Sequence, residues 1–322
     1  MKLNELSAYS REVGTMLASG LSLIRIYSKH MIKIRTYNRY KSICDLKLKP
    51  NLGNYELNEL TKMVLQDYLL KLINDSYSTS TIKGIVSVLK QALKLSITLE
   101  LVDKEYVSTL KLPSIEEKEI SVFNKKEQSI IESFCLTNKK TNYIGIVICL
   151  YTGIRLGELL ALTWNDIDFN TNLLTINKTQ YSAKLNGKYQ MIVDKPKTKK
   201  SIRVIPIPKD LIKILKSIKK ESKSNYVITT RKNKMVGNRS YQRTFEFILK
   251  KLNIKYRNFH SLRHTFATNA IELGMDVKTL AEILEHTNAM ITLNRYSHSL
   301  LSYKIDMMNK LGKNLNLSIK NG

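Results

Sequence analysis

The sequence predicts a mainly α-helical protein of two domains, with a small antiparallel β-sheet in the second domain (an α+β fold). Apolar residues recur three and four positions apart through most of the chain, which is the spacing of amphipathic helices. After Trp164 this period gives way to short alternating stretches, which are typical of strands. A length of 322 residues is more than one simple core needs and suits two domains.

The chain is strongly basic, because it has 53 Lys and Arg residues and only 27 Asp and Glu residues, which gives a net charge of +26. Such an excess of like charges is mutually repulsive in the folded state and usually indicates that the protein binds a polyanion. Nucleic acid is the first candidate, since phosphates dominate the affinity of such proteins. A membrane-surface protein is the alternative, but here the basic residues are spread along the chain rather than gathered in one anchoring tail.

Cysteine usage and hydropathy point to the cytoplasm. Cys44, Cys135 and Cys149 lie far apart without Cys-x-x-Cys spacing, which predicts reduced thiols in the core. No N-terminal signal is visible, and the most apolar run, 143–154, is too short to span a bilayer and stops at Arg155. We therefore expect a cytoplasmic, nucleoid-associated protein.

The first half of the chain is expected to be helical. Ser80 and Thr81 can cap a helix with Lys83, Lys90 and Lys94 on its polar face. The apolar face comprises Ile82, Ile85, Val86, Leu89, Ala92 and Leu93. A lysine face is most often simply solvated, but the net charge makes DNA binding by these three lysines an equal alternative.

A linker is expected at residues 113–121, where Pro113 and a charge cluster interrupt the helical pattern. The domains are then 1–112 and 122–322, and the second begins with a capping box from Asn124 to Glu127. Segments 173–180 and 188–193 are predicted strands joined by a turn at Asn186-Gly187. Segment 201–208, ended by prolines, adds an edge strand, and helices return from Leu211.

Arg155 is the first candidate for chemistry. Gly153 can end the preceding helix, so Arg155 falls near the N-terminus of the next helix, where an anion is stabilised. Glu158, three residues later, is expected on the same face and can hold the guanidinium. Taken alone, an arginine in a turn and a pair at this spacing are most often ordinary features of a protein surface.

A second cluster is His260-Ser-Leu-Arg263-His264, whose three polar residues share one helical face. His-x-x-x-His is also a zinc spacing. A zinc site is disfavoured, because no glutamate follows His260, no third ligand is suitably spaced, and Arg263 would repel the ion.

His286, Tyr296 and Lys197 complete the candidate set. The chain has 17 tyrosines, but Tyr296 stands apart in its polar setting downstream of His286. Lys197 lies in a lysine-rich segment beside the predicted strands and can act as a mobile proton donor. The sequence has neither a phosphate-binding Walker loop nor a nucleophile-elbow serine. Paired acidic residues at two-metal spacing are also missing from 150–300, apart from Asp166 and Asp168, so we expect phosphoryl chemistry without metal.

Five motifs in one order resemble those of the phage integrase family, the tyrosine recombinases. They begin at Tyr151 (Tyr-Thr-Gly-Ile-Arg-Leu-Gly-Glu), Lys197 (Lys-Thr-Lys), Phe259 (Phe-His-Ser-Leu-Arg-His), His286 and Tyr296 (Tyr-Ser-His). The resemblance covers the whole second domain. The segments 36–40 and 52–53 of the first domain also resemble the family's SAM-like, core-site DNA-binding domain.

The resemblance implies a site-specific DNA recombinase that needs no cofactor, metal or ATP. Tyr296 is then the nucleophile and forms a 3′-phosphotyrosyl bond. Lys197 protonates the departing 5′-oxygen; its neighbours Lys195 and Lys199 are alternatives for this role. His260 assists proton transfer at the tyrosine.

The resemblance also implies how the phosphate is held. Arg155 and Arg263 grip the non-bridging oxygens, His286 donates a hydrogen bond, and Glu158 braces the site. One departure stands out, because the family commonly has glycine where this chain has Glu285. An acidic side chain is therefore expected near the phosphate.

The architecture implied is a two-domain clamp around double-stranded DNA with inverted-repeat core sites. Such proteins are monomers or dimers when free and homotetramers on synapsed DNA, with room for an accessory DNA-bending or directionality factor. The helix at 299–311 is then an exchange helix that packs on a neighbouring protomer, although packing on its own domain is the alternative. The short N-terminal segment favours integration or excision of a mobile element, or DNA inversion, at simple core sites.

Three other functions remain open from the sequence. A type IB topoisomerase would use the same chemistry without a specific site. A non-catalytic DNA-binding regulator could share the fold, although the intact set of cations argues against one. A metal-dependent nuclease would require divalent ions.

Overall fold

The computed structural model describes residues 32–56, 59–98, 121–138, 142–185, 187–195, 202–286, 288, 290 and 297–314. The chain divides into two compact units, one comprising Met1–Lys118 with Ala183–Tyr189 and the other Glu119–Ser182 with Gln190–Gly322. Most of the predicted linker, 113–120, lies outside the described residues, so the predicted domain boundary stays a prediction.

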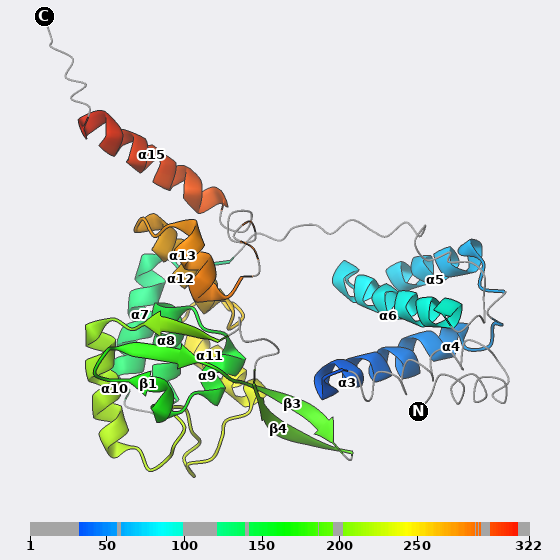
Figure 1. Ribbon diagram of the computed structural model, residues 1–322, viewed down its shortest axis with the longest axis horizontal. Coiled ribbons are helices and arrows are strands. Elements are labelled where there is room, and N and C mark those ends of the chain that lie inside the picture. The colour runs from blue at the N-terminus through cyan, green and yellow to red at the C-terminus, as the bar shows by residue number, and fades with distance from the viewer. Residues whose placement is uncertain are drawn as a thin grey trace, which may run out of the picture. The chain divides into compact units, whose positions relative to one another are not determined.

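The first unit is helical where it is described, apart from the strand ends near residue 187 (Figure 1). Its helices are α3 (Ile34–Ile43), the π-helix η1 (Cys44–Leu48), α4 (Lys49–Leu52), α5 (Lys62–Asn74) and α6 (Thr79–Thr98). The six apolar residues predicted for one face of α6 are all buried, which confirms that face. The predicted cap was wrong: α6 begins at Thr79, so Ser80 and Thr81 lie in its first turn, and Ser78 Oγ accepts the Thr81 N–H at 3.3 Å.

The second unit is built around α8 (Ile144–Thr152), in which every residue except Tyr151 is buried. Helices α7 and α12 both pack against α8, and α7 begins with the predicted Asn124–Glu127 capping box. The other helices are α7 (Lys125–Thr137), α9 (Leu156–Ala161), η3 (Trp164–Asp166), α10 (Lys209–Glu221), α11 (Asn238–Lys251), α12 (Ser261–Glu272), α13 (Val277–Leu284) and α15 (Ser297–Asn314).

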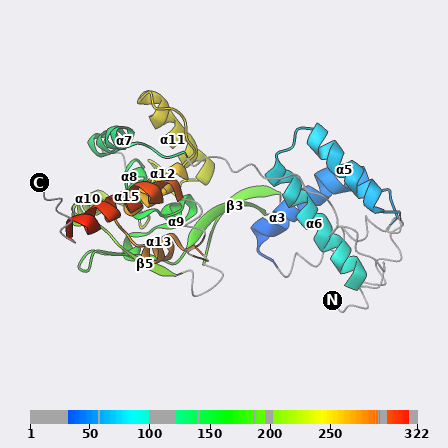
Figure 2. The same ribbon diagram turned by 90° about the horizontal axis from the view of Figure 1, so that it is seen from above.

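The described strands form two small antiparallel sheets rather than the single sheet predicted. One has the order β1-β2-β5, and the other is the β3–β4 hairpin (Figures 1 and 2), whose residues Ala183–Tyr189 belong to the first unit. The strands are β1 (Ile167–Asp168), β2 (Leu173–Ile176), β3 (Thr179–Leu185), β4 (Lys188–Asp194) and β5 (Arg203–Pro206). The predicted strand 173–180 is broken before Thr179, where Lys178 turns aside to bind Asp166 at 2.7 Å. The edge position of β5 and its end at Pro206 agree with the prediction.

The mainly helical fold with small antiparallel sheets is therefore confirmed. All three cysteines are buried, as expected of core thiols. Within the described part of the chain, no helix is both long and apolar enough to cross a membrane.

Candidate active site

The position of Arg155 depends on a sharp turn at Gly153. This glycine ends α8 with φ of 63°, a left-handed backbone conformation that residues other than glycine rarely adopt. A Cβ atom there would lie 2.5 Å from the Phe266 ring and 2.8 Å from Leu284. The tight turn leaves Arg155 as the N-cap residue of α9.

Arg155 and Glu158 form the contact that their spacing predicts. The Arg155 Nη1 group donates to Glu158 Oε1 at 2.9 Å, and its backbone N–H donates to Glu158 Oε2 at 2.9 Å. Burial by itself raises the pKa of Glu158, but hydrogen bonds and charge from Arg203 and Arg155 outweigh it, so the pKa is lowered. Burial likewise lowers the pKa of Arg155, and the two carboxylates of Glu158 and Glu285 reverse that effect and raise it. Both groups are therefore held in their charged forms.

The cluster on α12 is split between the surface and the core. Arg263 is 3% exposed, and its Nη1 donates to the Gly153 carbonyl at 2.9 Å. His260 is exposed at the N-cap of α12 and His264 is half-buried. The two imidazole rings lie edge to face, with centroids 4.7 Å apart. The histidines thus share a face as predicted, while Arg263 points inward between them.

The C-terminal end of α13 gathers the arginines. Three consecutive carbonyls there accept their hydrogen bonds; these belong to Ile283, Leu284 and Glu285. Arg203 Nε donates to the first at 2.7 Å, and Arg155 Nη2 donates to the second at 3.3 Å and the third at 3.2 Å. Arg263 Nη2 also donates to the second carbonyl. The last carbonyls of a helix lack partners within it and carry partial negative charge, so they attract cations.

Glu285 ends α13 in the left-handed conformation, with φ of 54° and ψ of 47°. Glycine adopts this conformation most easily, which explains why the sequence resemblance predicts a glycine at the position that Glu285 occupies. The carboxylate forms ion pairs with Arg155 and, at 3.3 Å, with Arg203. The next residue, His286, is half-buried and donates its backbone N–H to the Ala281 carbonyl at 2.9 Å. His286 is thereby tied to the same helix end as the arginines.

Arg203 is a member of this cluster that the sequence analysis missed. Only 8% of its side-chain surface is exposed. It binds Glu158 with both terminal nitrogens, at 2.7 Å to Oε2 and 3.2 Å to Oε1. A signal was present in the sequence, because strand alternation puts Arg203 on the same face as the buried Ile205. A charged side chain facing a core needs a partner of opposite charge.

The remaining candidates are placed as follows. Lys197 and Tyr296 lie outside the described residues. Lys83, Lys90 and Lys94 lie on α6 in the other unit, where Lys94 is exposed and the other two are half-buried. Among the described residues, no group of three or more His, Cys, Asp and Glu side chains is arranged to hold a metal ion.

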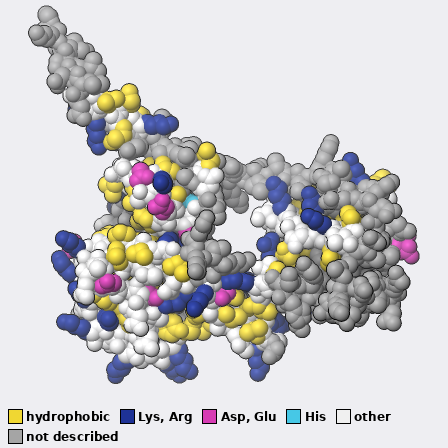
Figure 3. All heavy atoms as spheres, in the orientation of Figure 1, with side chains coloured by type: hydrophobic (Ala, Val, Ile, Leu, Met, Phe, Trp, Pro, Cys, Tyr) yellow, Lys and Arg dark blue, Asp and Glu magenta, His cyan; other side chains and the backbone are white. Residues whose placement is uncertain are grey.

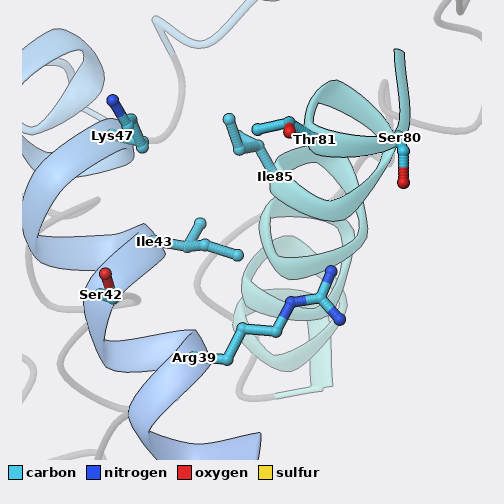
Figure 4. A pocket seen from close by; sticks show the side chains of 7 residues that line it. All are labelled: Arg39, Ser42, Ile43, Lys47, Ser80, Thr81 and Ile85. Carbon is cyan, nitrogen blue, oxygen red and sulfur yellow. The ribbon is translucent and has the colours of Figure 1, made fainter. Parts of the chain in front are cut away.

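A basic pocket of about 360 Å³ lies between α3, η1 and α6 in the first unit (Figure 4). Arg39 reaches from α3 toward α6, and Lys47, Ser42 and Thr81 add polar groups around it. Lys and Arg side chains are also scattered over the visible face of the second unit, where acidic side chains are fewer (Figure 3). The pocket is a candidate phosphate-binding surface that the sequence analysis did not name.

Two family models match the chain. The model described as "Phage integrase family" matches residues 118–302, and "Phage integrase, N-terminal SAM-like domain" matches residues 26–73. Among curated relatives, a "Tyrosine recombinase XerC-like" protein of Caldanaerobacter subterraneus is 30% identical over 286 residues, covering 81% of this chain and 73% of the relative. The "Transposase from transposon Tn916" of Enterococcus faecalis is 25% identical and covers 97% of this chain and 82% of its own.

Solved structures share the fold. The Tn1549 transposon integrase, determined in complex with a circular intermediate DNA, superposes with a TM-score of 0.78 at 22% identity over 92% of this chain and 99% of that one. A lambda integrase tetramer bound to a Holliday junction has a TM-score of 0.67 at 20% identity, over 85% of this chain and 78% of that one.

Proposed function

The chain belongs to the phage integrase family of tyrosine recombinases, and we propose that Tyr296 is the nucleophile with which it cuts and rejoins DNA strands at specific sites. The phenolic oxygen of Tyr296 attacks a backbone phosphorus, and the bond from phosphorus to the 5′-oxygen breaks. His260 takes the phenolic proton, and Lys197 supplies the proton that leaves with the 5′-oxygen. The product is a 3′-phosphotyrosyl bond and a free 5′-hydroxyl.

Rejoining reverses these steps. The 5′-hydroxyl of an incoming strand attacks the phosphotyrosyl phosphorus, Lys197 takes its proton, and Tyr296 leaves and recovers a proton through His260. Because the covalent intermediate conserves the energy of the phosphodiester, the cycle consumes neither ATP nor another cofactor.

The main support for this proposal is that two arginines far apart in the sequence donate hydrogen bonds to the same backbone carbonyl. Arg155 and Arg263 both donate to the Leu284 carbonyl, two residues before His286. Arg155 is the more accessible of the two, with 38% of its side chain exposed. We propose that Arg155, Arg263 and His286 bind the non-bridging oxygens, where charge builds up in the transition state, and that Glu158 braces Arg155.

We further propose double-stranded DNA with inverted-repeat core sites as the substrate. The relatives determined with DNA, including the tetramer on a Holliday junction, support a homotetramer on synapsed sites, assembled from monomers or dimers. Helix α15 supports exchange between protomers, since Ile305, Met308 and Leu311 are each about half-exposed or more. Because its substrate is DNA, we propose that the protein is cytoplasmic and associated with the nucleoid, and that an accessory DNA-bending or directionality factor can take part.

The relatives from Tn916 and Tn1549 favour movement of a mobile element over inversion as the biological reaction. A topoisomerase is the second candidate because it would use the same chemistry. Relaxation of supercoiled plasmids that lack the core site distinguishes the two, since a site-specific recombinase should leave them unchanged.

The nucleophile is tested with a nicked duplex that traps the covalent intermediate. Genomic fragments selected by binding supply the core sequence, and the adduct is measured on a denaturing gel. Wild type should form the adduct equally with and without EDTA, and Tyr296→Phe should form none. Tyr303→Phe, which removes a tyrosine elsewhere in the C-terminal segment, is the matched control. An adduct that persists in Tyr296→Phe rules out this nucleophile.

A further inference from the structure

Among the described residues, Arg203 binds both of the carboxylates that pair with Arg155, and it is itself almost wholly buried. Its two terminal nitrogens hold both oxygens of Glu158, and Nη1 also lies 3.3 Å from Glu285 Oε2. Its Nε is fixed by the Ile283 carbonyl at 2.7 Å. Two arginines and two carboxylates thus form a closed, electrically balanced cluster in which Arg203 is the buried cation and Arg155 the accessible one.

Both terminal nitrogens of the Arg155 guanidinium are engaged within the protein, although 38% of the side chain is exposed. Its Nη1 donates to Glu158 and Glu285, and its Nη2 faces the carbonyls of Leu284 and Glu285. These contacts involve both terminal nitrogens and therefore the edge that binds an anion most strongly. A phosphate that binds there must displace at least one acceptor.

The Glu285 carboxylate is the acceptor most readily displaced. It is a side chain rather than backbone, it is 26% exposed, and the same oxygen that contacts Arg155 already contacts Arg203. A carboxylate that loses its only cation in a half-buried site is strongly destabilised. Because Arg203 remains, Glu285 and Glu158 each keep one cation when Arg155 turns to a phosphate.

We propose that Arg203 is a positioning residue for strand cleavage, which gives Glu158 and Glu285 a second cation and so releases Arg155 to bind the scissile phosphate. This inference rests on the proposed function of Arg155. It assigns Arg203 no contact with DNA; the side chain acts through the two carboxylates and the end of α13.

The test compares Arg203→Met with wild type in single-turnover cleavage of the nicked duplex. Without Arg203, both carboxylates compete for Arg155, so the cleavage rate should fall roughly tenfold to a hundredfold. The Kd for uncleaved duplex should change by no more than about threefold, because most contacts with DNA phosphates lie elsewhere. Lys178→Met is the matched control, since Lys178 pairs with the similarly buried Asp166 away from this cluster. It should lower stability and leave the cleavage rate of folded protein near that of wild type.

Rescue by a second substitution separates positioning from simple loss of structure. Glu285→Gly removes the carboxylate that Arg203→Met leaves without its buried cation, and glycine suits the backbone φ of 54°. The double variant should therefore cleave faster than Arg203→Met alone. The inference is overturned if Arg203→Met cleaves at the wild-type rate, if Lys178→Met is slowed as much, or if the double variant shows no recovery.

A stability cycle keeps the inference testable if the proposed function itself fails. Absence of any adduct with wild type would count against the proposed function. The free energies of urea unfolding of wild type, both single variants and the double variant then show whether Arg203 and Glu285 are coupled. Coupling predicts that Glu285→Gly destabilises wild type more than it destabilises Arg203→Met. Additive effects would refute the placement of Glu285 between the two arginines.

Discussion

At the scale of single residues, the charged state of Glu158 makes stability depend on pH. Its pKa is lowered in the folded protein, because the pairing with Arg203 and Arg155 outweighs burial. A carboxyl of this kind stabilises the fold above its unfolded pKa of about 4.3, and that stabilisation is lost as the pH falls through the lower folded pKa. The direction follows because the unfolded state binds the proton more readily.

Glu158→Gln should therefore lower the free energy of unfolding by about 1–3 kcal/mol at pH 7, because it removes one charge from a buried pair. The difference from wild type should shrink as the pH is lowered below about 4. Urea unfolding from pH 7 to pH 3 measures it. Asp210→Asn, which alters an exposed pair with Lys213, is the control and should show no comparable pH-dependent loss. A difference that is unchanged at acid pH contradicts the assignment.

Gly153→Ala tests the turn that presents Arg155. The left-handed φ and the close approach of Phe266 and Leu284 should together destabilise the variant by about 2–4 kcal/mol. Gly187→Ala is a matched control, because that glycine also has a positive φ, of 81°, but nothing lies within 4 Å of the added Cβ. It should lose only about 1 kcal/mol from backbone strain. Equal losses in thermal or urea unfolding would show that crowding contributes nothing.

At the scale of elements, the sequence predicted what local spacing determines. The apolar face of α6, the capping box of α7 and the helix end at Gly153 all follow from residues within a few positions of one another. The separation into two sheets did not follow, because the alternating pattern does not mark the break before Thr179, where Lys178 binds Asp166. Arg203 was missed for the same reason, since its partners on α9 and α13 are distant in sequence.

Helix α15 gives a prediction at this scale. Its exposed residues Ile305 and Met308 form an apolar strip that a neighbouring protomer is proposed to cover. Met308→Lys should weaken assembly on the core-site duplex by about tenfold, roughly the loss of one buried methionine, without lowering the melting temperature of the free protein. Sedimentation of the protein–DNA complex measures the assembly. Lys310→Met, which alters an exposed lysine on the same helix, is the control. Helix α15 contacts α12 of its own unit, so a lowered melting temperature would instead show that Met308 itself packs on that unit.

At the scale of the whole molecule, two units carry a net charge of +26, which one active site cannot account for. The arginines of the active site are balanced by Glu158 and Glu285, so this cluster adds little net charge. In the part of the chain that the structure describes, other basic side chains lie outside this cluster, including the lysines of α6 and the pocket that contains Arg39 and Lys47. Such a distribution favours binding along a length of DNA backbone over binding at one phosphate.

The salt dependence of DNA binding tests this distribution and the function proposed for α6. Each phosphate neutralised by a lysine contributes about 0.9 to the slope of log K against log salt concentration. If Lys90 and Lys94 meet phosphates, Lys90→Gln with Lys94→Gln should weaken binding of specific and unrelated duplexes alike and reduce the slope by about 2. Lys213→Gln, which alters an exposed lysine paired with Asp210, should leave the slope unchanged. Glutamine keeps the helix and removes only the charge. An unchanged slope in the double variant would therefore identify this face of α6 as merely solvated. The DNA contacts of the first unit would then have to come from elsewhere, and Arg39 and Lys47 would be the next pair to substitute.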